Sequence, residues 1–213
     1  MSYSIVTINV NGLRDKGKRL KLFHYFEKKK YDIIFAQETH CGSDDEVVLW
    51  SNQWSGKSIW NNGSSQSKGV AVLFKKQLDI QFTDIIKDDE GRLISFSSKS
   101  DNDQVYQFTN IYAPNNGKHR RKFLKNLQPI LQKFDTNVHV IGGDFNCVSK
   151  FDLDRNLIER SAHTTRDEGE IELADLQNVL NLEDVWRRRH PNTKMYTFSR
   201  GNSKSRIDYF LCS

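Results

Sequence analysis

Short apolar runs that recur along the whole chain constrain its fold more than any other feature of the sequence. The runs are rich in β-branched and aromatic residues and end in polar or turn-forming residues, which is typical of β-strands. We predict strands over residues 4–10, 32–37, 69–74, 80–86, 93–98, 105–112 and 138–141. A chain with so many short strands must build its core against sheets.

Three segments instead have apolar residues at helical spacing, and we predict helices over 18–30, 123–134 and 171–180. The first helix lies between the first two strands, which indicates a β-α-β unit, whereas the strands between residues 69 and 112 favour antiparallel pairing. No repeat, long linker or break in composition divides the 213 residues, of which 37% are hydrophobic. The pattern therefore predicts one α/β domain with packed sheets and helices outside them.

Positive charge is gathered in patches. The net charge is +5, and residues 184–213 alone carry seven Lys and Arg against two Asp. Further basic clusters lie at 28–30 and 118–122. Such patches can follow the phosphate backbone of a nucleic acid, although each is equally explained as a solvated helix end or loop.

Membrane-spanning and disulfide-stabilised classes do not fit this sequence. The longest apolar run, Val70 to Phe74, is far shorter than the roughly 18 residues of a membrane helix, so we expect no membrane partner. The three Cys residues are widely spaced, and the N-terminus lacks the pattern of a secretion signal. We therefore expect an intracellular, reducing location.

Polar side chains follow several predicted strands at the point where each strand ends. They are Asn9, Asn11, Glu38, Tyr112, Asp144 and Asn146, and Asp208 lies within a late apolar run. Strand ends in a layered α/β domain commonly meet at one edge, and the Gly142-Gly143 pair permits close backbone approach there. Singly, these residues are also explained as turn or loop residues, Tyr112 as a packing residue, and Asp208 as an ion-pair partner of Arg206.

Five motifs, in this order, resemble those of the exonuclease-endonuclease-phosphatase superfamily. They are TINVNGL at 7–13, AQETH at 36–40, NIYAPN at 110–115, GGDFN at 142–146 and SRIDYFL at 205–211. Within it, the chain is most similar to the apurinic-type endonuclease domain of long interspersed (non-LTR) retrotransposons, notably at 37–40, 153–155 and 190–199. The resemblance implies a four-layer α/β sandwich, with two packed mixed β-sheets and outer helices, formed by residues 1–213 as a single endonuclease domain.

The resemblance also implies cleavage of phosphodiester bonds with a divalent metal, Mg²⁺ or alternatively Mn²⁺. Glu38 is implied as the carboxylate ligand of the metal, and Asn9 as a second residue of the metal site, where it orients a metal-bound water or the neighbouring acid. Mg²⁺ keeps most of its waters, so one or two carboxylates are sufficient to bind it.

The remaining catalytic roles are implied in the same way. Asp144 is expected to position or deprotonate the attacking water, and Asn146 to hold Asp144 and a phosphate oxygen. Tyr112 is expected to give its hydroxyl to the phosphate or leaving group, and Asp208 to orient a histidine nearer the C-terminus.

Basic and polar residues beside the late motifs, and after the Tyr-Ala-Pro turn, are predicted to contact DNA: Arg155, Thr197, Arg200, Lys204, Arg206, Lys118, Arg120 and Arg121. In this family the loop after Tyr-Thr-Phe is a hairpin that enters the minor groove, and Ser199 to Lys204 takes that place. We expect it to sense groove width and deformability more than base edges.

One part of the family pattern is not matched. The family continues to a Ser-Asp-His motif whose imidazole faces the scissile phosphate, whereas this sequence ends at Ser213 and none of its six His follows a Ser-Asp pair. We therefore expect residues 1–213 to lack the strand that carries this motif, to leave a sheet edge open, and to be weak or inactive on their own.

The resemblance thus predicts a monomeric domain that nicks double-stranded nuclear DNA and leaves a 3'-hydroxyl for target-primed synthesis by a downstream reverse transcriptase domain of the same polyprotein. Two alternatives stay open. An abasic-site repair endonuclease would carry a Trp-Arg pair before its Leu-Asp-Tyr segment, where this chain has Lys204-Ser205-Arg206. A non-catalytic DNA-binding module would bind duplex in a salt-sensitive way without nicking it.

Overall fold

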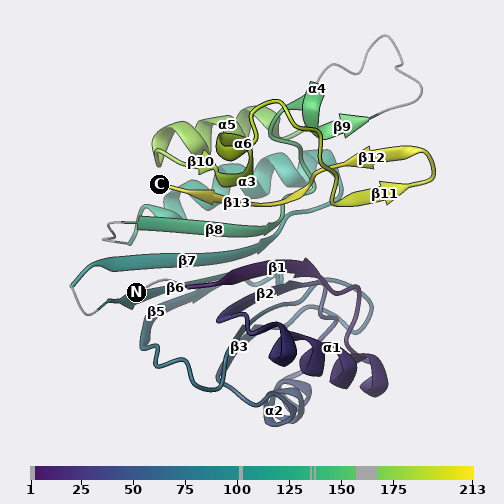
Figure 1. Cartoon of the computed structure of the whole chain (residues 1–213), viewed down its shortest axis with the longest axis vertical. Coiled ribbons are helices and arrows are strands. Elements are labelled where there is room, and N and C mark those ends of the chain that lie inside the picture. Colours follow the sequence, from purple (N-terminus) through teal and green to yellow (C-terminus); the bar gives the residue numbers. More distant parts are fainter. Residues whose placement is uncertain (1–2, 101–102, 135, 137, 157–166) are drawn as a thin grey trace.

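A computed structural model describes residues 3–100, 103–134, 136, 138–156 and 167–213 of the chain. Two large sheets pack face to face, and helices cover the outer face of each (Figure 1). Both sheets contain parallel and antiparallel pairs. The predicted four-layer α/β sandwich with two mixed sheets is therefore confirmed.

The first sheet has four strands in the order β1-β2-β4-β3, which are β1 (Ile5–Asn9), β2 (Ile33–Gln37), β4 (Val70–Phe74) and β3 (Ser58–Asn61). β1 and β2 are parallel and are joined by helix α1 (Lys16–Lys29), so the predicted β-α-β unit is present. The carboxylate of Asp15 begins α1 by accepting the N–H of Lys18 at 2.6 Å. β1 lies at the edge of this sheet.

The second sheet has six strands in the order β10-β13-β8-β7-β6-β5. These are β10 (Glu183–Asp184), β13 (Asp208–Cys212), β8 (Val138–Asp144), β7 (Val105–Tyr112), β6 (Leu93–Lys99) and β5 (Phe82–Lys87). Strands β5, β6 and β7 pair in antiparallel fashion, as predicted. Strand β7 is parallel to β8, and helix α3 (Gly117–Leu131) connects the two.

Strand β8 continues to Asp144, three residues beyond its predicted end, because glycines permit it. A Cβ at Gly142 would lie 2.3 Å from the ring of Phe210 on β13, and one at Gly143 would lie 2.0 Å from the carbonyl oxygen of Ile111 on β7. Only glycine allows the neighbouring strands to approach this closely. The expected close approach at this pair is confirmed.

Three apolar clusters fill the spaces between the four layers. Strand β2 shows the alternation that creates them: Ile33 and Phe35 face the other sheet, while Ile34 and Ala36 face the helices α1 and α2 (Asp44–Gln53). The third cluster joins the six-stranded sheet to α3 and α5 (Glu170–Val179). Within the described residues, no helix is both long and apolar enough to cross a membrane.

Several short elements were not among the predictions. Helix α2 begins at Asp44 and is capped by Ser43, whose side chain accepts the N–H of Glu46; β3 follows the helix. The others are β10, β13, α4 (Phe151–Asp154), β9 (Arg155–Asn156) and α6 (Val185–Arg189), whereas β11 (Phe198–Arg200) and β12 (Ser203–Ser205) were expected only as a hairpin. β11 and β12 form a hairpin at the predicted position and join β9 in a small third sheet.

Candidate active site

Three neighbouring strands of the six-stranded sheet bring Tyr112, Asp144 and Asp208 into one row. Tyr112 pairs in register with Asp144 across β7 and β8, and Asp144 pairs with Asp208 across β8 and β13. Residues of these strands that belong to the apolar cluster between the sheets lie an even number of positions from Tyr112, Asp144 and Asp208, so all of them share one face of the sheet. Their side chains therefore face the four-stranded sheet.

The four-stranded sheet contributes Asn9 and Glu38 to the same place. Asn9 is the last residue of β1, and Glu38 directly follows β2. Glu38 has a φ of 53°, in the left-handed region that side chains other than glycine rarely adopt. The N–H of Gly12 holds this turn by donating to the Glu38 carbonyl at 2.7 Å. A strained residue fixed by its surroundings is typical of a functional site.

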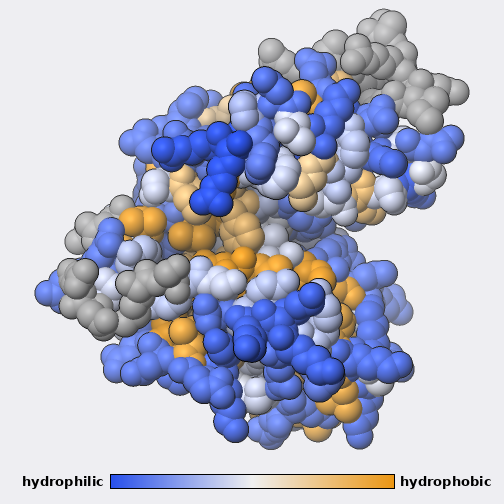
Figure 2. Space-filling model, viewed as in Figure 1, coloured by the Kyte–Doolittle hydropathy of each residue, from blue (hydrophilic) through white to orange (hydrophobic). Residues whose placement is uncertain are grey.

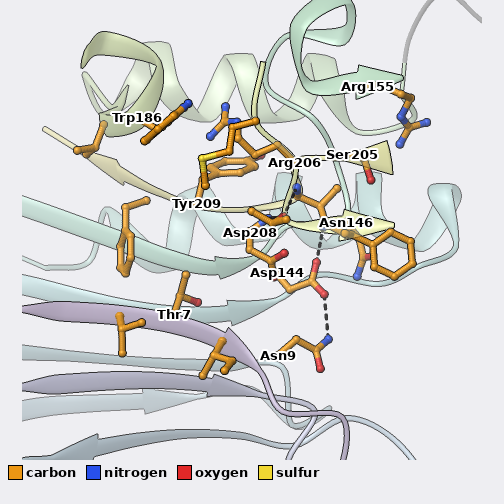
Figure 3. Close-up of a pocket in the computed structure, with 18 of the residues that line it drawn as sticks. Thr7, Asn9, Asp144, Asn146, Arg155, Trp186, Ser205, Arg206, Asp208 and Tyr209 are labelled. Carbon is orange, nitrogen blue, oxygen red and sulfur yellow. Dashed lines mark hydrogen bonds between the residues drawn. The ribbon is translucent and has the colours of Figure 1, made fainter. Parts of the chain in front are cut away.

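The amide of Asn9 connects carboxylates from the two sheets, and Figure 3 shows its bond to Asp144. Its Nδ2 donates to Glu38 Oε1 at 2.9 Å and to Asp144 Oδ2 at 3.1 Å. Its Oδ1 accepts the N–H of Asn11 at 3.0 Å. Asn9 therefore orients the two acids, as predicted, and its place in a metal site stays a prediction.

Hydrogen bonds keep Glu38 ionised. Burial raises the pKa of Glu38, but hydrogen bonds from Asn9, Tyr112 and His40 outweigh this and hold the pKa below its usual range. Burial and the bond to Glu38 raise the pKa of Tyr112 far above its usual value. The phenol thus keeps its proton, and the pair presents a carboxylate with a hydroxyl donor attached.

Asp144 and Asp208 have the opposite electrostatic character. Burial, followed by the negative charge of Asp208, raises the pKa of Asp144 to about 7 in spite of the hydrogen bonds from Asn9 and Asn146. Burial also raises the pKa of Asp208, and a hydrogen bond from Thr197 partly offsets it. Because two adjacent buried carboxyls resist ionising together, the pair holds a proton close to neutral pH. Such a group can exchange a proton with water.

The turn after β8 fixes the Asp144 carboxylate. Asn146 has a left-handed φ of 49°, and its backbone N–H donates to Asp144 Oδ1 at 2.9 Å. Its side-chain Nδ2 donates to the carbonyl of Ala113 at 2.8 Å. Asp144 and Asn146 are therefore both turn formers and site residues, because the Asx turn that they form holds the acid in place.

The oxygen donors at this point fit a hard divalent cation such as Mg²⁺. Glu38 offers an ionised carboxylate at the cleft, and Asp144 lies on the other side of the Asn9 amide. Mg²⁺ prefers such oxygens and retains several waters. In the parts of the chain that the structure describes, no three or more His, Cys, Asp or Glu side chains are grouped to hold a metal.

These groups open into a cleft of about 1210 Å³ between β1 on one side and β13, α6 and the β11–β12 hairpin on the other (Figure 3). Hydrophobic residues line the hollow in the space-filling view (Figure 2). Sequence reasoning assigned no role to several lining residues, namely Trp186, Arg189, His190, Met195 and Phe198. Phe198 is 48% exposed, and its place in the matched Tyr-Thr-Phe segment was the signal that the sequence offered.

Most of the predicted DNA contacts lie at the surface. Thr197, Arg200 and Lys204 are exposed on or beside the hairpin, and Lys118 and Arg121 are exposed on α3. Arg155 is half-buried, lines the cleft and forms an ion pair with Asp167. These side chains are available to a polyanion, and their contact with DNA stays a prediction.

The predicted DNA contacts of Arg206 and Arg120 are wrong. Arg206 is 1% exposed, and its guanidinium pairs with Asp154 and Asp184 rather than with Asp208. Arg120 is 7% exposed and donates to the backbone carbonyls of Pro114, Asn115 and Glu168. Arg206 uses all three of its guanidinium nitrogens inside the protein, and Arg120 uses Nε and Nη1 there, so both side chains are held away from a phosphate backbone at the surface.

Comparison with known proteins agrees with this geometry. Residues 6–213 match the protein-family model described as Endonuclease/Exonuclease/phosphatase family. The chain is 30% identical, over 218 residues, to the Transposon TX1 uncharacterized 149 kDa protein of Xenopus laevis, covering 100% of this chain and 16% of that protein.

Solved structures share the fold. AP endonuclease LMAP from Leishmania major has a TM-score of 0.76 and 18% identity, covering 99% of this chain and 79% of that one. An AP endonuclease from Archaeoglobus fulgidus has a TM-score of 0.74 and 21% identity, covering 98% of this chain and 85% of that one.

Proposed function

Since the chain belongs to the Endonuclease/Exonuclease/phosphatase family, we propose that it is a metal-dependent endonuclease that nicks duplex DNA. The observation that carries the proposal is that the Asn9 amide connects two different pairs, Glu38 with Tyr112 and Asp144 with Asp208. Glu38 is ionised and accepts a hydroxyl, while Asp144 and Asp208 retain a proton near neutral pH. One pair suits a cation and a phosphate, and the other suits proton transfer.

The residues of this chain divide the work of phosphodiester hydrolysis. Mg²⁺ held at Glu38 would supply positive charge to the scissile phosphate. Asp144 accepts a proton from the attacking water, because its pKa of about 7 leaves much of it ionised at neutral pH. Tyr112 keeps its proton, which it donates to Glu38 in this structure and would turn toward a phosphate or leaving oxygen during the reaction, while Asn9 holds both acids in place.

The wider biological role is part of the same proposal. The similarity to a transposon protein extends over the whole chain, and this supports a domain whose nick leaves a 3'-hydroxyl for target-primed reverse transcription. The chain spans only 16% of that relative's length, so a reverse transcriptase domain is a proposed partner. The proposed substrate is nuclear DNA, and the proposed state of the isolated domain is a monomer.

Cleavage at abasic sites is a second candidate. It is favoured by the fold shared with AP endonucleases and by the apolar residues Met195 and Phe198 in the cleft wall, which suit an extrahelical sugar. Ser205 stands where the repair-type sequence has Trp, which weighs against it. A rate on abasic duplex more than about a hundredfold above that on intact duplex would favour this candidate.

The proposal is tested by nicking of supercoiled plasmid. We expect Mg²⁺ to allow conversion to the open circle by this chain or by a version that carries a Ser-Asp-His segment after Ser213, with chelation stopping the reaction. A polymerase should extend the new ends, because the nick leaves a 3'-hydroxyl. If both versions bind duplex without nicking it, the endonuclease proposal fails and the binding-module alternative takes its place.

The hairpin gives a prediction about target choice. We expect the double substitution Arg200→Ser and Lys204→Ser to lower the slope of log affinity against log salt by about two, and to redistribute the nicks, because two exposed cations are lost beside the cleft. Binding titrations at several salt concentrations and sequencing of the nicked ends measure this. Lys28→Ser with Lys30→Ser removes the same charge at the end of α1 and serves as control. An unchanged nick distribution would contradict the hairpin's role.

A further inference from the structure

Four charged side chains, Asp154, Asp184, Arg187 and Arg206, form a buried charge cluster beside the cleft. None of them is more than 6% exposed, and their formal charges cancel. They come from three segments that are far apart in sequence: the end of α4, the start of α6 and the residue between β12 and β13. The cluster is therefore a junction of these segments rather than a local ion pair.

Arg206 is at the centre of the cluster and uses both edges of its guanidinium. Nε and Nη2 donate to Oδ1 and Oδ2 of Asp154 at 2.8 and 2.9 Å. Nη1 donates to Asp184 Oδ1 at 3.2 Å, and Nη2 also contacts Asp184 Oδ2. The guanidinium carbon lies 4.9 Å from the centre of the Tyr209 ring. A planar fork held at two edges and one face has a single orientation.

Arg187 extends the cluster to the loop before the hairpin. Its Nη2 contacts Asp154 Oδ1. Its Nη1 donates to the backbone carbonyls of His190, Pro191 and Thr193 at 3.0, 3.4 and 2.9 Å. This loop leads into the cleft wall, so the conformation of the wall depends on a buried guanidinium.

The segments that meet in the cluster carry the proposed DNA contacts and one catalytic acid. Asp154 is followed by Arg155, whose strand pairs with β12 of the hairpin, and the Arg206 N–H donates to the Asp154 carbonyl at 2.8 Å. Two residues after Arg206, the N–H of Asp208 donates to Thr197 Oγ1 at 3.1 Å. One junction therefore connects the hairpin, Arg155 and Asp208.

A buried ion cluster is a costly way to stabilise a fold, because desolvation of the charges offsets most of their attraction, and an apolar replacement often does as well. Unlike an apolar contact, such a cluster fixes the orientation of the segments that it joins. We propose that the buried charge cluster is a positioning device that holds the β11–β12 hairpin and Arg155 at a fixed offset from Asp208, and thereby determines which phosphodiester bond is nicked. This inference rests on the proposed function.

The offset matters because the hairpin binds DNA at one place and the acids cut at another. The distance between the two decides which phosphate reaches the acids. Arg206→Lys keeps the charge but replaces a fork with a single ammonium, which cannot hold Asp154 and Asp184 in one geometry. We expect KM to rise about tenfold, kcat to change less than about threefold, and nicks to spread to neighbouring bonds.

Arg19→Lys is the matched control. Arg19 is also buried and donates to Leu13 and Gln53, but it packs against Trp50 beneath the outer helices, away from the hairpin. The Arg19→Lys variant should nick DNA at the same positions as the unmodified chain. Asp184→Asn, which keeps the shape of that side chain, replaces Arg206→Lys if the latter does not fold.

Two readouts separate this inference from the proposed function. Sequencing of nicked ends reports the cut positions, and hydroxyl-radical footprinting reports where the protein binds without any need for cleavage. If neither the unmodified chain nor the version that carries a Ser-Asp-His segment after Ser213 nicks DNA, although both leave a footprint, the proposed function fails. If Arg206→Lys leaves both the footprint and the cut positions unchanged, or only lowers activity in proportion to its unfolded fraction, the positioning role is overturned. A displaced or spread footprint supports it.

Discussion

Asp144→Asn is expected to stabilise the fold by about 2 kcal/mol at about pH 8 and, in the same protein, to reduce nicking at least about a thousandfold. The pKa of Asp144 lies at about 7, raised mainly by burial and by the charge of Asp208. Relative to its ordinary value of 3.8, this corresponds to about 4 kcal/mol spent on keeping the carboxylate ionised. Asn carries no charge, but it gives up one of two accepted hydrogen bonds, which offsets about half of the gain.

The sign of the pH dependence follows from the direction of the shift. A raised pKa means that the folded protein binds a proton that the unfolded chain releases between about pH 4 and pH 7. The stability that Asp144 contributes is therefore fully present below about pH 4 and is lost as the pH rises through about 7. Asp144→Asn should remove this part of the pH dependence, so its advantage in stability grows from acidic to slightly alkaline pH.

Urea unfolding of both proteins at several pH values measures the effect, and plasmid nicking measures the loss of activity. Asp175→Asn is the control. Asp175 is exposed on α5, so this substitution makes the same chemical change outside the site. The account of the acid pair would be refuted if Asp144→Asn were less stable than the unmodified chain at about pH 8. Retained nicking would remove Asp144 from the proton transfer.

The fold was largely predictable because its main signals are local. The apolar run of β2, the β-α-β opening and the glycine pair before Asp144 are all encoded in adjacent residues, and each appears in the structure. Helix α2 was missed although its signals are present: Ser43 is an N-cap, and Asp44 opens an acidic first turn. Its exposed Val48 and Leu49 blur the amphipathic pattern on which the prediction depended.

The site was predictable in its residue types but not in its electrostatics. The convergence of strand ends brings Glu38 and Asp144 to one amide, as their positions after strands indicated. Which acid is ionised depends on burial and on partners distant in sequence, such as Tyr112 for Glu38 and Asp208 for Asp144. Composition cannot supply that information, because both residues are acids after apolar runs.

Whether a basic side chain is buried or exposed was the least predictable feature of the site. Arg206 stands among residues that are exposed, and its sequence position alone suggests a DNA contact or an ion pair with Asp208. The acids that bury it, Asp154 and Asp184, lie 52 and 22 residues away. A charged side chain next to a functional motif is therefore assigned to the surface or the interior only when its distant partners are known.

Glu38→Gln is expected to abolish Mg²⁺-dependent nicking, by at least about a thousandfold, while changing the melting temperature by less than about 3 °C. Glutamine has the shape of glutamate, and its oxygen can still accept the Asn9 amide at the 2.9 Å position. The hydroxyl of Tyr112 can rotate to accept from the new NH₂ group. What is lost is the negative charge, and a hydrated divalent cation binds an uncharged amide far more weakly than a carboxylate.

Glu46→Gln is the control, because it removes a similarly exposed carboxylate outside the site. Its side chain is 23% exposed against 22% for Glu38, and it bonds to Arg14 and to the Gly42 N–H on the outer face of the four-stranded sheet. Mn²⁺ titrations followed by water proton relaxation should show weakened binding for Glu38→Gln and unchanged binding for Glu46→Gln. Normal Mn²⁺ binding by Glu38→Gln would place the metal elsewhere, and Asp144, the other acid at the Asn9 amide, would then be the residue to test as its ligand.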